Sequence, residues 1–399
     1  MTVLADPPSR GPTQVAASRA GARDLRLDVA RGVAMLVIFT AHVPGNPWTL
    51  WIPARWGFSD ATEIFVFCSG LASSIAFGRS FERAGWTLGT ARVAHRVWQV
   101  YWAHLGLFVA VAAMLAALDL SGRFPERSYV DTLNLGPFFA DPGPLLVGLV
   151  TLTYVPNYFD ILPMYLAILA MMPLAMALAR VSPLLALGAS VALWCLAQRA
   201  VLDTAGLGAW HPALPAEPWS DRRWFFNPFG WQLLFFAGFA FGRGWLPAPP
   251  VSRPLLLAAA LVVLASVPLS DVGLREGGLE WARAWRAENA WAFHKSDFGP
   301  LRVLHFLALA YLAWAAAGEG GRRLHALGEG AVAAIVKVGQ QSLAVFVASM
   351  ALARAAGVAL DAAGRSDPTV AAVNLGGWAI LVGVAYAVAW FKAAPWKPR

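Results

Sequence analysis

The sequence predicts an all-α protein, a polytopic bundle of about ten transmembrane helices with both termini in the cytoplasm. Hydrophobic residues make up 58% of the 399 residues and charged residues only 14%, whereas a soluble domain carries about 25% charge. The charges are confined to short stretches between apolar runs. Many of the tryptophans lie near the ends of these runs, where the membrane interface favours amphipathic rings. Little of the chain is therefore expected to fold as a soluble domain.

Ten apolar runs approach the roughly 20 residues that a membrane-spanning helix needs. They are 27–43, 61–77, 97–118, 159–178, 184–201, 229–245, 255–269, 301–317, 331–352 and 370–390. An eleventh run, 145–155, is too short to span and is expected to be re-entrant or interfacial. The first run is interrupted by Asp28 and Arg31, and no small-residue cleavage site follows it. It is therefore expected to be an uncleaved helix and not a signal peptide.

Basic residues predict the orientation, because cytoplasmic loops are rich in Lys and Arg. With the N-terminus inside, the inner loops and the tail would hold Arg79, Arg83, Arg92, Arg96, Arg180, Arg243, Arg253, Arg322, Arg323, Lys392, Lys397 and Arg399. Ten spans with both ends inside fit this alternation, whereas an odd number would place the basic C-terminus outside. The net charge of +8 is then an orientation signal, and no nucleic-acid partner is expected.

The chain is expected to have three parts. Residues 1–26 are polar and basic and are predicted to be a disordered cytoplasmic segment, residues 27–391 form a single transmembrane domain, and residues 392–399 are a short cytoplasmic tail. Cys68 and Cys195 both lie inside apolar runs, which predicts neither a disulfide framework nor a metal site.

Ionisable groups inside a membrane cost about 2.5–3.5 kcal/mol each, so each is a functional candidate. In the first run, Asp28 and Arg31 are three residues apart and share one helix face. Eleven steps separate Arg31 from His42, which returns His42 to nearly the same face about 16 Å further along the axis. Alternatively, Arg31 extends to the inner interface and His42 caps a helix end.

The second run begins with two more acidic candidates, Asp60 and Glu63, again three residues apart. Glu63 could orient His42 and stabilise its cation, as a carboxylate does in a catalytic triad. It could equally be a structural partner of Arg55.

Basic side chains elsewhere are candidates for substrate binding. His104 lies in the third run, where a lone histidine is more often a hydrogen-bonded packing residue. A cluster before and within the eighth run could bind an anionic acyl group or a sugar polymer, and a solvated loop explains it equally well. Its members are His294, Lys295, Asp297, Arg302 and His305.

Several segments resemble a known family. The stretch LDVARGVAMLVIFTAH is similar to the first-helix signature of the type-3 membrane acyltransferase superfamily, in which an Arg is followed after ten residues by a His. The segments HVPGNPW, WGFSDATEIFVFCSGLASSIAFGR, ARVAHRVWQVYWAHL and GQQSLAVF narrow the resemblance to the OpgC family. These are membrane proteins associated with succinylation of osmoregulated periplasmic glucans. The resemblance extends over about 23–390 and is strongest in the first third.

The resemblance implies an O-acyltransferase of the bacterial inner membrane. It would move an acyl group, succinyl by this resemblance, from a cytoplasmic acyl-CoA to a hydroxyl of a periplasmic glucan or related polysaccharide. Its partners would be the lipid bilayer, acyl-CoA and the acceptor polymer, and acyl-CoA would be a donor substrate with no permanently bound cofactor. The Arg and His of the family correspond to Arg31 and His42.

Acyl transfer to an alcohol needs a base, and neutral histidine suits that role at pH 7. We expect His42 to be the base and Glu63 or Asp60 to orient it. Arg31 would contact CoA or neutralise the thioester oxyanion, paired at rest with Asp28.

Two further groups complete the predicted site. Arg31, Arg79, Arg92 and Arg96 could hold the phosphates of CoA, although positive-inside topology also explains them. The predicted substrate-binding residues are His104, His294, Lys295 and Arg302.

A proton-coupled transporter of a sugar or acidic metabolite is the alternative, because buried His, Asp and Glu also serve proton relays. No repeated halves with paired broken helices, which many transporters have, are visible in the sequence. A membrane sensor or scaffold is a third class, but the chain has no evident soluble output domain. The enzyme alone must bind an acyl-CoA and release free CoA.

Overall fold

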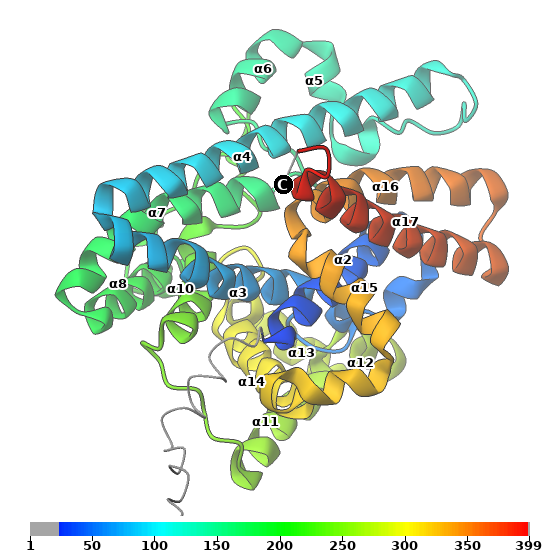
Figure 1. Ribbon diagram of the computed structural model, residues 1–399. Coiled ribbons are helices and arrows are strands. Elements are labelled where there is room, and N and C mark those ends of the chain that lie inside the picture. The colour runs from blue at the N-terminus through cyan, green and yellow to red at the C-terminus, as the bar shows by residue number, and fades with distance from the viewer. Residues whose placement is uncertain (1–23, 398–399) are drawn as a thin grey trace, which may run out of the picture.

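The computed structural model describes residues 24–397, and every regular element within them is a helix (Figure 1). The all-α prediction is therefore confirmed for the described residues. The predicted cytoplasmic segment 1–26 lies outside them except for its last three residues, and so do the last two residues of the predicted tail 392–399.

The longer helices account for the predicted apolar runs. They are α2 (Leu25–His42), α3 (Ala61–Ser73), α4 (Arg79–Leu120), α7 (Ile161–Val181), α8 (Pro183–Leu196), α10 (Pro228–Arg243), α11 (Arg253–Ser266), α14 (Pro300–Ala317), α15 (Glu329–Gln340), α16 (Ser342–Ala363) and α17 (Asp367–Ala393). The shorter helices are α5 (Gly136–Ala140), α6 (Pro142–Thr151), α9 (Arg199–Thr204), α12 (Asp271–Glu276) and α13 (Glu280–Glu288). Each predicted run except 331–352 falls mainly within one of these helices.

Five helical stretches among the described residues are long and apolar enough to cross a membrane. They are Ala61–Leu120, Ile161–Val181, Pro300–Ala317, Ser342–Ala363 and Asp367–Ala393. The first joins α3 to α4 through a π-helical turn and is kinked at Gly85, where φ is +78°. Its 60 residues are long enough for two crossings, since a helix rises 1.5 Å per residue and the apolar core is about 30 Å thick. The chain is thus a multi-pass membrane protein.

Polar side chains cap several of these helices at the positions where the sequence changes from loop to apolar run. The side chain of Asp24 accepts a hydrogen bond from the backbone of Arg26 at the start of α2. Asp60 and Glu63 form a capping box at the start of α3. Each cap satisfies backbone N–H groups that have no partner inside the helix.

The predicted span 331–352 is wrong, because the chain forms two helices there. A break at Gln341 separates α15 from α16, and α16 then continues to Ala363. The sequence interpretation joined them because both are apolar, and it ended the run at Leu352 because Arg354 and Asp361 follow. The polar groups of Gln340, Gln341 and Ser342 mark the break.

Glycines allow α2 to cross neighbouring helices closely. A Cβ atom at Gly32 of α2 would lie 2.1 Å from the carbonyl oxygen of Ile335, and one at Gly339 of α15 would lie 1.9 Å from that of Asp28. A similar crossing joins α3 to α10, where a Cβ at Gly70 would lie 1.9 Å from the Phe235 oxygen. Small residues permit this close packing of membrane helices. They place α2 beside α3, α15, α16 and α17.

Candidate active site

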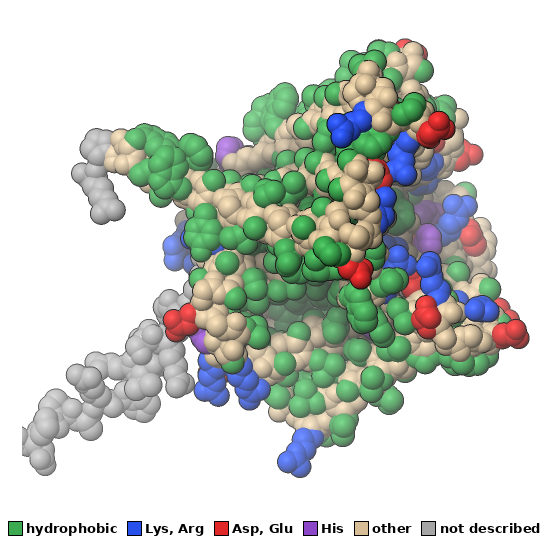
Figure 2. All heavy atoms as spheres, turned by 90° about the vertical axis from the view of Figure 1, so that its right-hand side faces the viewer, with side chains coloured by type: hydrophobic (Ala, Val, Ile, Leu, Met, Phe, Trp, Pro, Cys, Tyr) green, Lys and Arg blue, Asp and Glu red, His purple; other side chains and the backbone are tan. Residues whose placement is uncertain are grey.

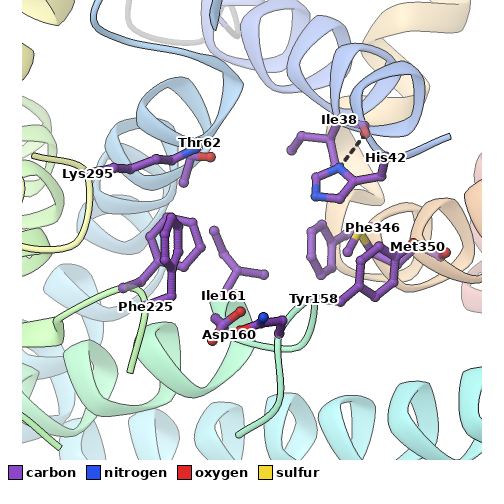
Figure 3. Close-up of a pocket in the computed structure, with 12 residues that line it drawn as sticks. Ile38, His42, Thr62, Tyr158, Asp160, Ile161, Phe225, Lys295, Phe346 and Met350 are labelled. Carbon is purple, nitrogen blue, oxygen red and sulfur yellow. Dashed lines mark hydrogen bonds between the residues drawn. The ribbon is translucent and has the colours of Figure 1, made fainter. Parts of the chain in front are cut away.

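His42 faces a cavity of about 350 Å³ (Figure 3). Its walls come from α2, α3, α7 and α16 and from three loops. The lining residues are Ile38, His42, Thr62, Asn157, Tyr158, Asp160, Ile161, Phe225, Phe226, Lys295, Phe346 and Met350. Most of the wall is apolar, and a few polar groups converge on it, as is usual for sites that bind small molecules.

His42 is the last residue of α2, and its ring is fixed by its own helix. Nδ1 lies 2.7 Å from the carbonyl oxygen of Ile38, one turn earlier. A carbonyl oxygen can only accept, so Nδ1 carries the hydrogen and the Nε2 of the neutral ring keeps its lone pair. The ring of Tyr158 packs edge-on against the imidazole at 5.5 Å between centroids. The geometry suits a general base.

The orienting partner predicted for His42 is not the one observed. Glu63 is fully buried, and its carboxylate accepts from the backbone N–H of Asp60 at 2.8 Å and from Nε of Arg302 at 2.7 Å. Its alternative partner, Arg55, instead pairs with Asp271. The carboxylate of Glu63 is engaged by the capping box and by Arg302. The backbone carbonyl of Ile38, and not a carboxylate, therefore orients the ring of His42.

Asp60 connects the same cluster to the cavity. Its Oδ2 lies 2.5 Å from Nζ of Lys295 and 3.6 Å from Nη2 of Arg302. Lys295 lines the cavity opposite His42 (Figure 3). Burial opposes ionisation, but Lys295 and Arg302 hold the pKa of Asp60 well below its ordinary value. The ion pairs among Asp60, Glu63 and Arg302 thus hold Lys295 at the edge of the cavity.

Three residues beside His42 were missed in the sequence. Tyr158 has a left-handed backbone with φ of +86°, which is rare for a bulky residue and is found at functional sites. Its hydroxyl donates to the carbonyl of Met350, and the guanidinium carbon of Arg354 lies 4.3 Å from its ring centroid. The Nε of Arg354 is buried and has no hydrogen-bond partner among the described residues.

Asp160, the third of these residues, lines the cavity just before the span Ile161–Val181. Burial raises its pKa to about 7, although Arg222 lowers it. Its position immediately before an apolar helix was the available signal, since acidic residues favour helix starts.

A second cavity, of about 290 Å³, lies at Arg31 on the same helix. Its lining residues are Arg31, Ser69, Ala72, Ser73, Ala76, Phe77, Arg92, His95, Arg96, Gln99 and Tyr165. Three of the four arginines predicted to bind CoA thus meet at one cavity. Arg79 is exposed and lies outside the lining. Arg31 donates to the hydroxyl of Ser342, at the start of α16, and Asp28 is buried one turn before it.

Lys295 is the one of the four predicted substrate-binding residues that lines a cavity. His104 is fully buried, and neither of its ring nitrogens has a hydrogen-bond partner among the described residues. His294 is largely exposed, with Nδ1 3.4 Å from Asp297. Arg302 is held by Glu63 and Asp60. His104 and Arg302 are placed for packing and charge pairing, away from the cavity lining.

The sequence model of a family described as OpgC protein matches residues 23–393, nearly the whole chain. Neither the curated proteins nor the solved structures gave a match.

Proposed function

We propose that this chain, which belongs to the OpgC family, is a membrane-bound O-acyltransferase. It transfers an acyl group from a cytoplasmic acyl-CoA to a hydroxyl of a periplasmic polysaccharide. The observation that carries the proposal is the free Nε2 of His42, which faces one cavity while Arg31 of the same helix lines another.

In the proposed reaction His42 acts as general base. Its Nε2 takes the proton of the acceptor hydroxyl while that oxygen attacks the thioester carbonyl. A C–O bond forms, the C–S bond breaks, and the CoA sulfur leaves and takes up the proton, so that the products are an ester and free CoA. Lys295 lies opposite His42 and would stabilise the negative oxygen that develops on the carbonyl.

The second cavity would hold the CoA portion of the donor. Arg31, Arg92 and Arg96 line it, and guanidinium groups bind phosphates through paired hydrogen bonds. Arg92 is already oriented by Ser80, at 2.5 Å, and Arg96 by Gln99, at 3.1 Å. One end of the guanidinium of Arg92, and one end of that of Arg96, is thus fixed by a hydrogen bond within the protein before the donor binds.

A dicarboxylic acyl group such as succinyl fits the surroundings of His42. Lys295 lines the cavity on one side, and Arg354 lies behind Tyr158 on the other. A partly buried guanidinium is costly unless an anion accompanies it. The free carboxylate of a succinyl group would supply that anion.

The acceptor would enter from the face at which α16 and α17 are joined. Figure 2 shows this face hollowed, with charged side chains of both signs gathered along one side of the hollow. A glucan or related polysaccharide, rich in hydroxyls, suits such a polar entrance. The transporter alternative is not favoured, since the match covers nearly the whole chain with an acyltransferase-type family.

The proposed topology keeps ten spans, with α16 as the ninth in place of 331–352. Both termini then lie in the cytoplasm of a bacterium, and the protein resides in its inner membrane. Arg31 is on the inner side and His42 on the outer side of the first span, about 16 Å apart along the helix.

The test uses the purified full chain in lipid vesicles with radiolabelled succinyl-CoA and a mixed glucan. Wild type should release CoA and label the sugar, and His42→Ala should lower the rate by about 10²–10⁴-fold. His294→Gln, a change at an exposed histidine outside both cavities, is the matched control and should keep the rate. Absence of CoA release from any acyl-CoA in wild type would overturn the proposal.

A further inference from the structure

Three helices, α2, α3 and α7, contribute residues to both cavities. On α2, His42 and Ile38 line the first cavity and Arg31 lines the second. On α7, Ile161 lines the first and Tyr165, one turn later, lines the second. The cavities therefore follow one another along a common direction, and about one helical turn, or roughly 6 Å, separates their walls on α7.

The helix α3 shows what lies between them. Thr62 lines the first cavity, and Ser69 begins the wall of the second. Phe65 lies between these residues on the same face, since positions three and four apart are neighbours on a helix. Beyond Ser69 the wall along this helical stretch consists of small side chains as far as Phe77, and these small side chains leave room for a slender chain. The small residues lining this part are Ser69, Ala72, Ser73 and Ala76.

Three aromatic rings fill the separation. The ring of Phe65 stacks on Phe346 with centroids 5.8 Å apart, and it meets Tyr165 edge-on at 6.3 Å. Phe346 lines the first cavity and Tyr165 the second, so Phe65 contacts one ring from each side. All three side chains are buried. They come from three different helices, α3, α7 and α16.

We propose that the two cavities are halves of one passage and that Phe65, Tyr165 and Phe346 form a septum across it. This inference rests on the proposed function, because it names what the passage takes: the thioester-bearing arm of the acyl-CoA. With the CoA phosphates at Arg31, the thioester must pass this septum to reach His42. The three rings set the width of the acyl arm that enters, and in their closed position they keep water from crossing to the donor.

The septum makes a prediction about acyl selectivity. Phe346→Ala should shorten the ring wall at the His42 cavity, so that longer acyl groups, such as octanoyl, are transferred at least about tenfold faster relative to succinyl than in wild type. Hydrolysis of acyl-CoA without acceptor should also rise. Phe239→Ala, which removes a buried ring of α10 that lines neither cavity, is the control and should leave both quantities unchanged.

A labelling experiment tests the septum without any turnover. Ser69→Cys, in a background with Cys68→Ser and Cys195→Ser that removes both native thiols, is treated with a membrane-impermeant thiol reagent from either side of oriented vesicles. We expect labelling from the Arg31 side only, and labelling from both sides when Phe346→Ala is added. Equal labelling from both sides without Phe346→Ala, or no outer labelling with it, would overturn the septum. Since this readout needs no catalysis, a failed acyltransferase assay leaves it interpretable and the two failures are distinguished.

Discussion

The Nδ1 atom of His42 lies 2.7 Å from the carbonyl oxygen of Ile38, one turn earlier in the same helix. The C-terminal end of α2 thus provides an acceptor that fixes both the tautomer and the direction of the ring. Catalytic histidines commonly receive this support from a carboxylate. Here a backbone carbonyl supplies it, and the two carboxylates nearby are engaged in a capping box and in ion pairs.

Glu63→Gln should therefore act on stability and not on the chemistry. The change removes the charge that faces Arg302 and leaves a buried guanidinium partly unpaired, at a cost of about 3–5 kcal/mol. Thermal unfolding in detergent should show the loss. The pH profile of turnover in the folded fraction should match wild type. A shifted profile with unchanged stability would instead make Glu63 the orienting partner of His42.

The arginines of the second cavity should govern donor affinity. Arg31→Gln, Arg92→Gln and Arg96→Gln should each raise the KM for acyl-CoA by about 10–150-fold, the effect of losing a charge-assisted contact of about 1.5–3 kcal/mol. Arg79→Gln is the matched control, since Arg79 is exposed and does not line the cavity. Steady-state kinetics at saturating acceptor measure the difference. Equal effects at all four positions would argue that these residues serve topology alone.

Arg354 should determine the preference for a dicarboxylic acyl group. Arg354→Gln removes the cation above the Tyr158 ring and should lower kcat/KM for succinyl-CoA by about 10–100-fold. Transfer from propionyl-CoA, which lacks the carboxylate, should change little. Competition between the two donors in one vial gives the ratio directly. An equal loss of kcat/KM for both donors would mean that Arg354 supports the fold and does not bind the carboxylate of the acyl group.

Asp160 should make stability depend on pH near neutrality. Burial raises its pKa to about 7 in the folded protein, against about 3.9 in an unfolded chain. A group with a raised folded pKa stabilises below its unfolded pKa, and this contribution is lost as pH rises through about 7. Wild type should therefore lose stability relative to Asp160→Asn as the pH rises from about 4 to about 7, as measured by thermal unfolding, and the difference should stay constant above that. Parallel curves for the two proteins would contradict the shifted pKa.

Hydropathy predicted the helices well because a long apolar run leaves a membrane chain few alternatives. It failed at 331–352, where α15 and α16 are both apolar and hydropathy does not report the break at Gln341. The prediction that Arg31 and His42 lie on one helix also succeeded, because both residues belong to a single apolar run, which forms α2.

Contacts between elements were the harder part of the site. Lys295 is held at the cavity by its ion pair with Asp60, which is 235 positions away in the chain. No local sequence pattern predicts a pairing over such a separation. The sequence did not indicate Tyr158, because it is an aromatic residue in a loop. It did not indicate Arg354, because this charged residue lies beyond the predicted end of a span. Glu63 was misassigned because its spacing from Asp60 fits both a capping box and a carboxylate that orients a histidine.

A sided assay measures whether an acyl group crosses from a cytoplasmic donor to an outer acceptor at His42. Radiolabelled succinyl-CoA is sealed inside vesicles that hold the protein in its proposed orientation, and glucan is supplied outside. The proposed transfer should place label on the outer glucan and leave free CoA inside, with both lost in His42→Ala and kept in His294→Gln. Label that appears outside as intact succinyl-CoA or free succinate, with none on the glucan, would contradict it.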